Sequence, residues 1–259
     1  MVDARYSRQS ILRVFEPGDF DRIRESTIVV VGIGGTGSMA ADLFARVGVK
    51  KLKIVDRDFV SISNLHRQIL YDDDDIGEPK VAVAKRKLNR INPDVSIEEC
   101  NAAFDASNAE DLISDADLVF DGTDNFTTRL IINDACVKLR KPWIYTSAIE
   151  TYGEVKTIIP GKTSCLACYV TMPNQRQPVC SEVGVFPSVP NMVASFAFTM
   201  AIKALTGHEV SGDLFFFDPW KGDTQKLAIK RNDSCKSCSR NEFEYLDKKY
   251  SSLGIRPLI

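Results

Sequence analysis

Short apolar runs alternate with helical stretches along the first 150 residues of the chain. The clearest of them, Thr27 to Val31, is a continuous β-branched run, as in a strand that is buried on both faces of a parallel sheet. The pattern predicts strands at 27–31, 51–55, 95–99, 118–120 and 143–147, and helices at 38–47, 80–91 and 126–139. Strands that alternate with helices in this way predict a doubly wound, Rossmann-like α/β sheet.

After residue 150 the alternation stops. A strand at 155–159 has no crossover helix behind it, a strongly apolar helix is predicted at 191–205, and strands at 214–217 and 226–229 suggest a closing hairpin. No internal repeat and no low-complexity linker interrupts the chain. We therefore expect a single domain over 1–238, with a mixed C-terminal extension to the sheet, followed by a short tail over 239–259.

The composition is that of an ordinary globular protein. Of 259 residues, 44% are hydrophobic and 26% are charged, and 33 Lys and Arg against 35 Asp and Glu give a net charge of −2. Because there is no basic surplus, neither a nucleic acid nor an anionic membrane is expected as a partner. The N-terminus has no apolar signal core, and no later run reaches transmembrane length, so we expect a cytoplasmic protein.

Four of the seven cysteines form two Cys-x-x-Cys pairs, Cys165 with Cys168 and Cys235 with Cys238. That spacing lets two thiolates reach one metal from a tight turn, and two such pairs supply a closed tetrahedral set for Zn²⁺. The alternatives are two unrelated reduced pairs or one redox pair. A thioredoxin-like pair would open a helix after a strand, whereas the residues before both pairs are typical of loops. The doubled spacing therefore predicts a zinc site that clips two distant loops together.

A glycine fingerprint, Gly32-x-Gly34-x-x-Gly37, lies between the first predicted strand and the helix that follows. Glycine permits a tight turn there, and the N-terminus of the helix faces phosphate. Asp56 ends the next strand, where an acid can bond the hydroxyls of a ribose. Taken alone, this pattern would suggest an NAD-dependent oxidoreductase.

Basic and amide side chains beyond the second strand favour a different chemistry. Asn64, Arg67, Gln68 and Lys80 can fold over a triphosphate, which a dehydrogenase does not need. Nucleotidyl transfer depends on positioning and on charge neutralisation, and such groups supply both. Asp124 follows the fourth strand, at the edge where doubly wound sheets bind ligands, and an acid there can hold Mg²⁺. The plainer interpretations are solvated Arg and Lys side chains, and Asp124 as the cap of the next helix.

These motifs occur in the order of one family. The chain resembles the ubiquitin-activating-enzyme-like adenylyltransferases, and most of all the molybdopterin-synthase and thiamine-biosynthesis group. The resemblance covers roughly residues 5 to 238, and it rests on Arg5-Tyr6-Ser7-Arg8-Gln9, the glycine fingerprint with Gly35, Val55-Asp56-x-Asp58, Ser63-Asn64-Leu65-x-Arg67-Gln68, Gly77-x-Pro79-Lys80, Asn92-Pro93, Asp121-x-Thr123-Asp124-Asn125 and both cysteine pairs.

The resemblance implies an ATP-dependent enzyme that activates a small ubiquitin-like (β-grasp) carrier protein ending in Gly-Gly. The terminal carboxylate of the carrier would attack the α-phosphate of ATP, giving an acyl-adenylate and pyrophosphate. The product would serve sulfur transfer, in molybdopterin or thiamine synthesis or tRNA thiolation, or protein conjugation. Carried over by position, the roles would be the following: Gly32, Gly34, Gly35, Gly37, Asp56 and Asp58 hold the nucleotide, Asn64, Arg67, Gln68 and Lys80 contact its phosphates, Asp124 organises Mg²⁺, and Arg8 acts across a homodimer interface.

Cys180 matches a segment that, in some members of the family, carries a cysteine bonded covalently to the carrier as a thioester or acyl-persulfide. A thiolate beside an adenylate is a far better nucleophile than water. Equally, Cys180 could have no covalent function, since no adjacent His or Lys predicts a lowered pKa.

Two other functions remain open. A tRNA-directed dehydratase of the same superfamily would show a basic face and generally lacks the doubled cysteine pairs. A non-catalytic scaffold that binds a ubiquitin-like protein typically loses the phosphate-binding Arg, Lys or Asp, whereas this chain keeps Arg67, Lys80 and Asp124. An active adenylyltransferase is therefore the favoured hypothesis.

Overall fold

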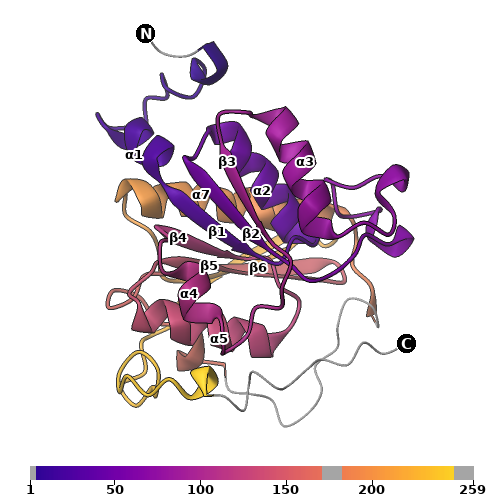
Figure 1. Ribbon diagram of the computed structural model, residues 1–259. Helices are drawn as coiled ribbons and strands as arrows, with labels where there is room; N and C mark the ends of the chain where they lie inside the picture. Colours follow the sequence, from indigo (N-terminus) through magenta and orange to yellow (C-terminus); the bar gives the residue numbers. More distant parts are fainter. Residues whose placement is uncertain (1–3, 171–182, 248–259) are drawn as a thin grey trace.

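A computed structural model of the protein describes residues 4–170 and 183–247 (Figure 1). These residues form one eight-stranded sheet in the order β3-β2-β1-β4-β5-β6-β7-β8. The strands are β1 (Thr27–Val31), β2 (Lys51–Val55), β3 (Ser96–Cys100), β4 (Leu118–Asp121), β5 (Trp143–Ile149), β6 (Tyr152–Ile158), β7 (Leu214–Asp218) and β8 (Asp223–Leu227). β1 to β5 pair in parallel, and β6, β7 and β8 extend the sheet with antiparallel pairs.

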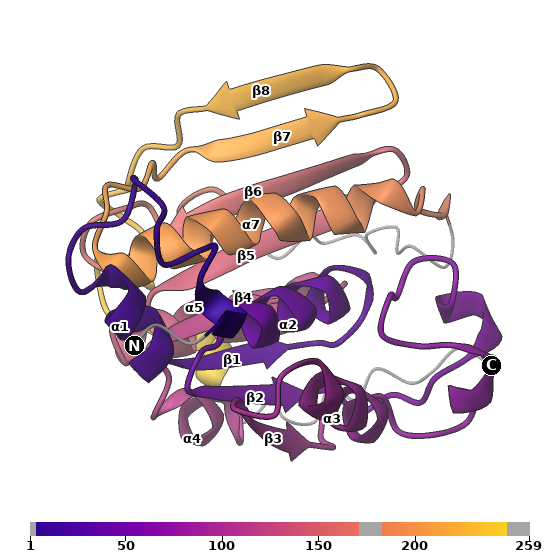
Figure 2. The same cartoon turned by 90° about the horizontal axis from the view of Figure 1, so that it is seen from above.

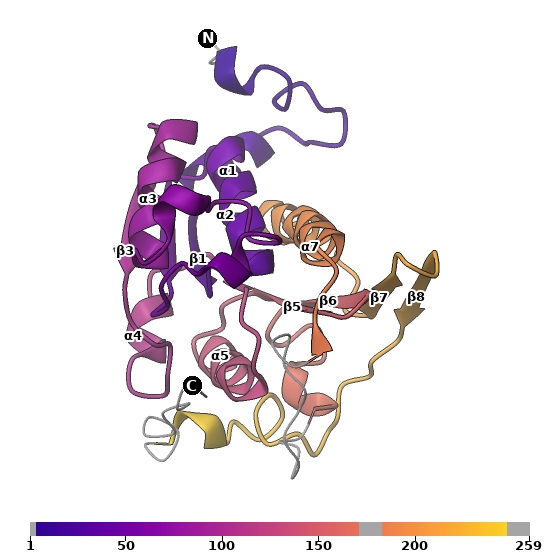
Figure 3. The ribbon, with the colours of Figure 1, turned by 90° about the vertical axis from the view of Figure 1, so that its right-hand side faces the viewer.

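Helices cover both faces of the sheet (Figures 2 and 3). After α1 (Asp19–Glu25), the chain places α2 (Gly35–Val47), α3 (Lys80–Ile91) and α7 (Ser188–Thr206) on one face, and α4 (Ala109–Ile113) and α5 (Phe126–Lys138) on the other. Each face has its own apolar core because side chains alternate along a strand. In β1, Ile28 and Val30 belong to the α2 core, and Val29 and Val31 to the α5 core. The predicted doubly wound sheet with a mixed extension is confirmed.

Several boundaries differ from the prediction: β6 begins at Tyr152, α7 begins at Ser188, and the short helix α4 is not among the predicted helices. Two other differences have a clear physical reason. α2 begins at Gly35 rather than at residue 38, because the glycine turn itself forms the first helical turn and Ser38 N donates to Gly34 O at 2.9 Å. β8 begins three residues earlier than predicted and ends two residues earlier. This edge strand is exposed along its whole length, so its polar sequence carries no hydrophobic alternation to mark it.

α7 is the long apolar helix of the second half. Among the described residues it is the one helix whose length and composition would allow it to cross a membrane, contrary to the expectation that no run reaches that length. In the structure it covers β5 and β6, and its residues Val189, Val193 and Ala197 lie in the core. A Cβ atom at Gly153 of β6 would lie 2.3 Å from Val193, so helix and sheet are in close contact. The sheet beneath α7 accounts for its hydrophobicity.

Residues 239–247, the first part of the predicted tail, lie against α5 (yellow in Figure 1). Phe243, Tyr245 and Leu246 pack on the core of that face. The Glu244 carboxylate lies 2.9 Å from Lys236 Nζ, which anchors the segment beside the second cysteine pair. The chain therefore turns back onto the domain after Cys238.

Candidate active site and cysteine cluster

The glycine turn between β1 and α2 brings backbone, rather than side chains, to the carboxyl edge of the sheet. Gly32 has a φ of 84°, and a Cβ atom at Gly37 would lie 1.8 Å from Gly32 O. The neighbouring loop is equally close, because a Cβ atom at Gly32 would lie 2.7 Å from Gly122 O. No side chain caps α2 at Gly34, so the amides of its first turn face this edge, where they can bind phosphate.

A buried ion pair fixes the loop that follows β4. Asp121, at the end of the strand, accepts hydrogen bonds from the backbone amide and the hydroxyl of Thr123 at 2.9 and 2.6 Å. Arg129 of α5 places Nε 3.3 Å from Asp121 Oδ2 and donates through Nη2 to Thr123 O at 2.7 Å and to Thr146 O at 3.0 Å. Burial raises the pKa of Asp121, and the Arg129 charge opposes that rise. The loop is thus held from beneath by charge-assisted bonds.

Asp124 is exposed on this loop. The next residue, Asn125, is the N-cap of α5, and its side-chain oxygen accepts a hydrogen bond from Thr128 N at 2.8 Å. The hypothesis that Asp124 caps the helix is therefore wrong. No residue that the structure describes forms a hydrogen bond with the Asp124 carboxylate, which leaves it available to a substrate or a metal ion.

Two side chains from the segment after β2 approach the glycine turn. Arg67 Cγ lies 3.7 Å from the position of a Cβ atom at Gly35, and Gln68 Nε2 lies 3.8 Å from that of a Cβ atom at Gly34. Gln68 is buried, and no donor within the described residues reaches its Oε1. Because a buried oxygen without a partner is costly, this atom suits a hydroxyl or an amine of a bound ligand. The side-chain oxygen of Asn64, unlike that of Gln68, already has a partner. It accepts a hydrogen bond from the backbone amide of Ser61 at 3.3 Å.

Acids at the end of β2 support the same edge. Asp56 accepts a hydrogen bond from Ile33 N, inside the glycine turn, and another from Asp58 N, each at 2.8 Å. Burial raises the pKa of Asp56, and the nearby Lys80 charge opposes this. Lys80 is buried at the start of α3, and its Nζ lies 3.3 Å from an oxygen of the exposed Asp58. Asp56 thus stabilises the turn, and Lys80 is a cation already held at the edge.

Two buried residues that the sequence did not single out hold these parts together. The Tyr71 hydroxyl donates to Ile33 O at 3.1 Å and lies 3.4 Å from Lys80 O, so it ties the glycine turn to α3. Burial raises the pKa of Tyr71, which keeps it a neutral donor. The second of these residues is Arg129, and the sequence does contain an indication that it is buried and paired. A lone arginine within an apolar helical stretch needs a buried partner, because an unpaired charge there is costly.

Arg8 does not lie at this site. Its neighbour Tyr6 is buried against Gly48, the C-cap residue of α2, and the Tyr6 hydroxyl accepts a hydrogen bond from Asn92 at 2.8 Å. The nucleotide edge is at the other end of α2, which has 13 residues. A helix of that length spans about 20 Å. Arg8 can therefore contribute to a composite site only from a second copy of the chain.

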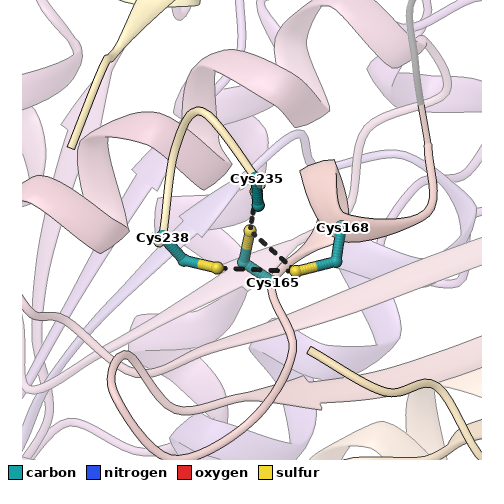
Figure 4. Close-up of side chains that lie close together, drawn as sticks. All are labelled: Cys165, Cys168, Cys235 and Cys238. Carbon is teal, nitrogen blue, oxygen red and sulfur yellow. Dashed lines mark hydrogen bonds between the residues drawn. The ribbon is translucent and has the colours of Figure 1, made fainter. Parts of the chain in front are cut away.

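The four paired cysteines meet at one point (Figure 4). Cys165 and Cys235 belong to the apolar core on the α5 face of the sheet. Their sulfur atoms all lie within 4.8 Å of one another, at 3.9 Å for Cys165–Cys168, 3.7 Å for Cys165–Cys235 and 3.4 Å for Cys168–Cys238. All four are free thiols. A tetrahedral ion with Zn–S bonds of about 2.3 Å needs sulfur separations of about 3.8 Å. The donor set therefore fits zinc, and the alternative of two unrelated pairs is wrong.

The cluster also favours thiolate at one position. The pKa of Cys168 is lowered to about 5, because the Cys165 thiol donates to its sulfur and the amide of Asn232 does so as well. Metal coordination requires deprotonated cysteine. Cys168 is therefore the thiol that loses its proton most readily, whereas the hydrogen bond to Cys168 raises the pKa of Cys165 and burial raises that of Cys235.

Cys180 lies in the segment 171–182, outside the described residues. The described chain resumes at Val183 and enters α7, where Pro190 Cβ lies 3.0 Å from the position of a Cβ atom at Gly35. The described residues that follow this segment, at the start of α7, therefore contact the glycine turn.

The ThiF family profile matches residues 6–237. The chain belongs to the ThiF family. It is 38% identical to the "Sulfur carrier protein ThiS adenylyltransferase" of Bacillus subtilis over 95% of this chain and 74% of that protein. It is 34% identical to the "Molybdopterin-synthase adenylyltransferase" of Escherichia coli over 91% and 96%, and 33% identical to the "SAMP-activating enzyme E1" of Haloferax volcanii over 94% and 91%. The predicted family and the predicted enzyme class, an adenylyltransferase, are confirmed.

Among solved structures, this ThiF-family chain is similar to MccB of E. coli with ATP. The TM-score is 0.81 at 22% sequence identity, and the match covers 92% of this chain and 75% of MccB. At that identity the similarity concerns the fold alone.

Proposed function

We propose that this protein uses ATP to adenylate the C-terminal glycine of a small ubiquitin-like carrier protein. The observation that carries the proposal is one edge of the sheet. There the glycine turn, the orphaned oxygen of Gln68, the cations Arg67 and Lys80 and the exposed Asp124 converge. The relatives named as sulfur carrier protein adenylyltransferases support the carrier as substrate.

The reaction follows from what each group can do. A carrier carboxylate oxygen attacks the α-phosphorus of ATP, and the bond from that phosphorus to the bridging oxygen breaks, releasing pyrophosphate. Negative charge builds on phosphate oxygens during this exchange. Arg67, Lys80 and the amides of the first turn of α2 would neutralise that charge, and positioning is the main contribution a protein makes to such a transfer.

A divalent cation fits this edge. Asp124 and the exposed Asp58 offer carboxylate oxygens, which are the ligands that Mg²⁺ prefers. Mg²⁺ bound there would screen phosphate charge. Asp124 would hold that ion beside the attacking carboxylate, and this is why we assign it the essential role.

Zinc at Cys165, Cys168, Cys235 and Cys238 would be structural, because four thiolates leave no open position for a substrate. We expect about one zinc ion per chain in the purified protein. A protein free of metal, or one with the absorbance of an iron–sulfur cluster, would contradict the assignment.

The active form would be a homodimer with two composite sites. The distance of Arg8 from the site of its own chain supports this, since Arg8 lies at the far end of α2. The carrier protein then decides the pathway, whether sulfur transfer to molybdopterin, thiamine or tRNA, or protein conjugation.

ATP–pyrophosphate exchange tests the proposal directly. It is measured with each small β-grasp protein ending in Gly-Gly from the same genome, and with the same protein lacking its last glycine. Exchange that depends on one carrier and on its terminal glycine is the expected result. Tight ATP binding without exchange for any carrier would contradict it, and would favour the tRNA-directed dehydratase or a non-catalytic scaffold.

A further inference from the structure

Two adjacent polar residues of α5 are completely enclosed by the protein. Asn133 is 0% exposed and Asp134 is 1% exposed, although both lie among apolar residues of the helix. Buried amides and carboxylates are costly unless every polar atom has a partner. The partners of this pair therefore show what the two residues hold.

Those partners come from both cysteine turns. Asn133 Oδ1 accepts a hydrogen bond from the amide of Leu166, which lies between Cys165 and Cys168, at 2.8 Å. Asn133 Nδ2 donates at 3.1 Å to the hydroxyl of Ser237, which lies between Cys235 and Cys238. One carboxamide thus bonds to the centre of each Cys-x-x-Cys turn.

Asp134 extends this hydrogen-bond network. It accepts a hydrogen bond from Ser237, another from Asn133 Nδ2 at 3.3 Å, and a third from the amide of Tyr245 at 2.9 Å. Burial raises the pKa of this carboxyl, and the three hydrogen bonds oppose the rise. The second cysteine turn and residues 239–247 are therefore fixed to the same helix.

We propose that Asn133 is a positioning residue for the metal site: it links both cysteine turns to α5, so that the fold holds the four thiols at ligand spacing before a metal binds. The inference rests on the zinc assignment above and adds to it. Because the two turns are 66 residues apart in the chain, a metal alone would have to bring them together against the entropy of closing that loop. With the Asn133 side chain bonded to both turns, folding of the domain already closes that loop before a metal binds.

The rate of zinc release tests this role. Zinc is captured from the folded protein by an excess of a coloured chelator, for the wild type, Asn133→Leu and Ser237→Ala. We expect Asn133→Leu to release zinc about 10–100 times faster, the usual cost of losing an outer-sphere partner, and Ser237→Ala to fall between. Asn92→Leu is the matched control, since Asn92 is also 0% exposed and bonds to Tyr6 and Ala45, remote from the cysteines.

The control should release zinc within about twofold of the wild-type rate, because its lost bonds stabilise another part of the domain. Asn133→Leu releasing zinc no faster than Asn92→Leu would overturn the proposal. If Asn133→Leu does not fold, Ser237→Ala decides, and a wild-type rate there would overturn it too. Absence of zinc from the wild-type protein would also overturn it, whereas carrier-dependent exchange in the same preparation would leave the adenylation proposal standing.

Discussion

The nucleotide edge and the cysteine cluster are both polar, yet they are constructed in opposite ways. At the nucleotide edge the backbone is tightly packed, while Asp124 and Asp58 stand exposed. At the cysteine cluster Cys165 is 1% and Cys235 is 3% exposed, and Asn133 is enclosed with its hydrogen bonds satisfied. One region leaves the carboxylate of Asp124 free for a bound ligand, whereas at the other the polar atoms of Asn133 are all bonded to the protein.

The difference shows how chemistry and stability make different demands on polar groups. A reacting group has to exchange partners during turnover, so it cannot be committed to the fold. A structural group stabilises only when its partners are permanent, because a buried group with no partner costs more than it contributes. α5 serves both demands. It begins directly after Asp124 and Asn125, and two turns later it carries Asn133.

The largest effect is expected at Asp124. Asp124→Ala should lower carrier-dependent exchange by about 10³-fold or more, because the charge that organises the reacting groups is lost. Its melting temperature should stay within about 1 °C of wild type, since the side chain is exposed. Asp111→Ala, an exposed acid on α4, is the control and should change neither quantity. Exchange within tenfold of wild type would mean that Asp124 is not part of the chemistry.

Arg129 does not fit the division between an exposed nucleotide edge and a buried cysteine cluster, because it lies under the nucleotide edge and is itself buried. Arg129→Met should lower the free energy of unfolding by about 3–5 kcal/mol, since it leaves the Asp121 carboxylate buried without its cation. Arg46→Met is the control. Arg46 also pairs with an acid, Asp42, at 2.7 Å, but its side chain is 60% exposed. We expect about 1 kcal/mol or less there, because solvent screens the pair.

Urea denaturation measures both variants. Equal losses of stability in Arg129→Met and Arg46→Met would show that the buried pair contributes no more than a surface pair. Carrier-dependent exchange should also fall in Arg129→Met, because Thr123 O loses its donor and the loop that carries Asp124 is less well held.

A smaller effect is expected when two inactive variants are mixed. This experiment tests whether one chain alone supplies every residue of the nucleotide edge. Arg8→Ala and Asp124→Ala subunits should each be inactive. Refolded together in equal amounts, they should recover about a quarter of wild-type exchange, since half of the dimers are mixed and each has one intact composite site. No recovery in dimers shown to be mixed would place Arg8 outside the site.

The smallest effect is expected for Cys180. Cys180→Ser should leave ATP–pyrophosphate exchange within about twofold of wild type, because a thiolate could capture the acyl group only after the adenylate has formed. Transfer of the activated carrier to an acceptor is the step in which a difference could appear. A large loss of exchange itself would contradict this order of events and give Cys180 a place in adenylate formation.

Local sequence patterns predict much of this fold and of its candidate site. The β-branched run at 27–31 placed β1 at its observed residues, since a strand buried on both faces must be apolar throughout. β2 is also at its predicted residues, although it contains Lys51 and Lys53. The glycine fingerprint predicted the tight turn between β1 and α2, and the doubled Cys-x-x-Cys spacing predicted the cysteine cluster. β8 was misplaced because an exposed edge strand is under no such demand.

The partners of buried polar side chains had no comparable signal in the sequence. Asp134 bonds to Tyr245, and Arg129 bonds to Thr146, across separations in sequence that no local pattern reveals. In the sequence Asn133 and Asp134 look like two ordinary polar positions of a helix, and only packing makes them connectors.

The sequence by itself determined the class of fold, the glycine turn, the four cysteines of the cluster and the family, because each depends on residue type at short, regular spacing. The tertiary structure alone decided which polar groups are free and which are committed. It left Asp124 exposed, made Asn125 the helix cap, placed Arg8 at the wrong end of α2 for its own site and joined both cysteine turns to α5. The physical reason is that burial and partnership belong to the three-dimensional neighbourhood of a side chain, not to the residues beside it in the chain.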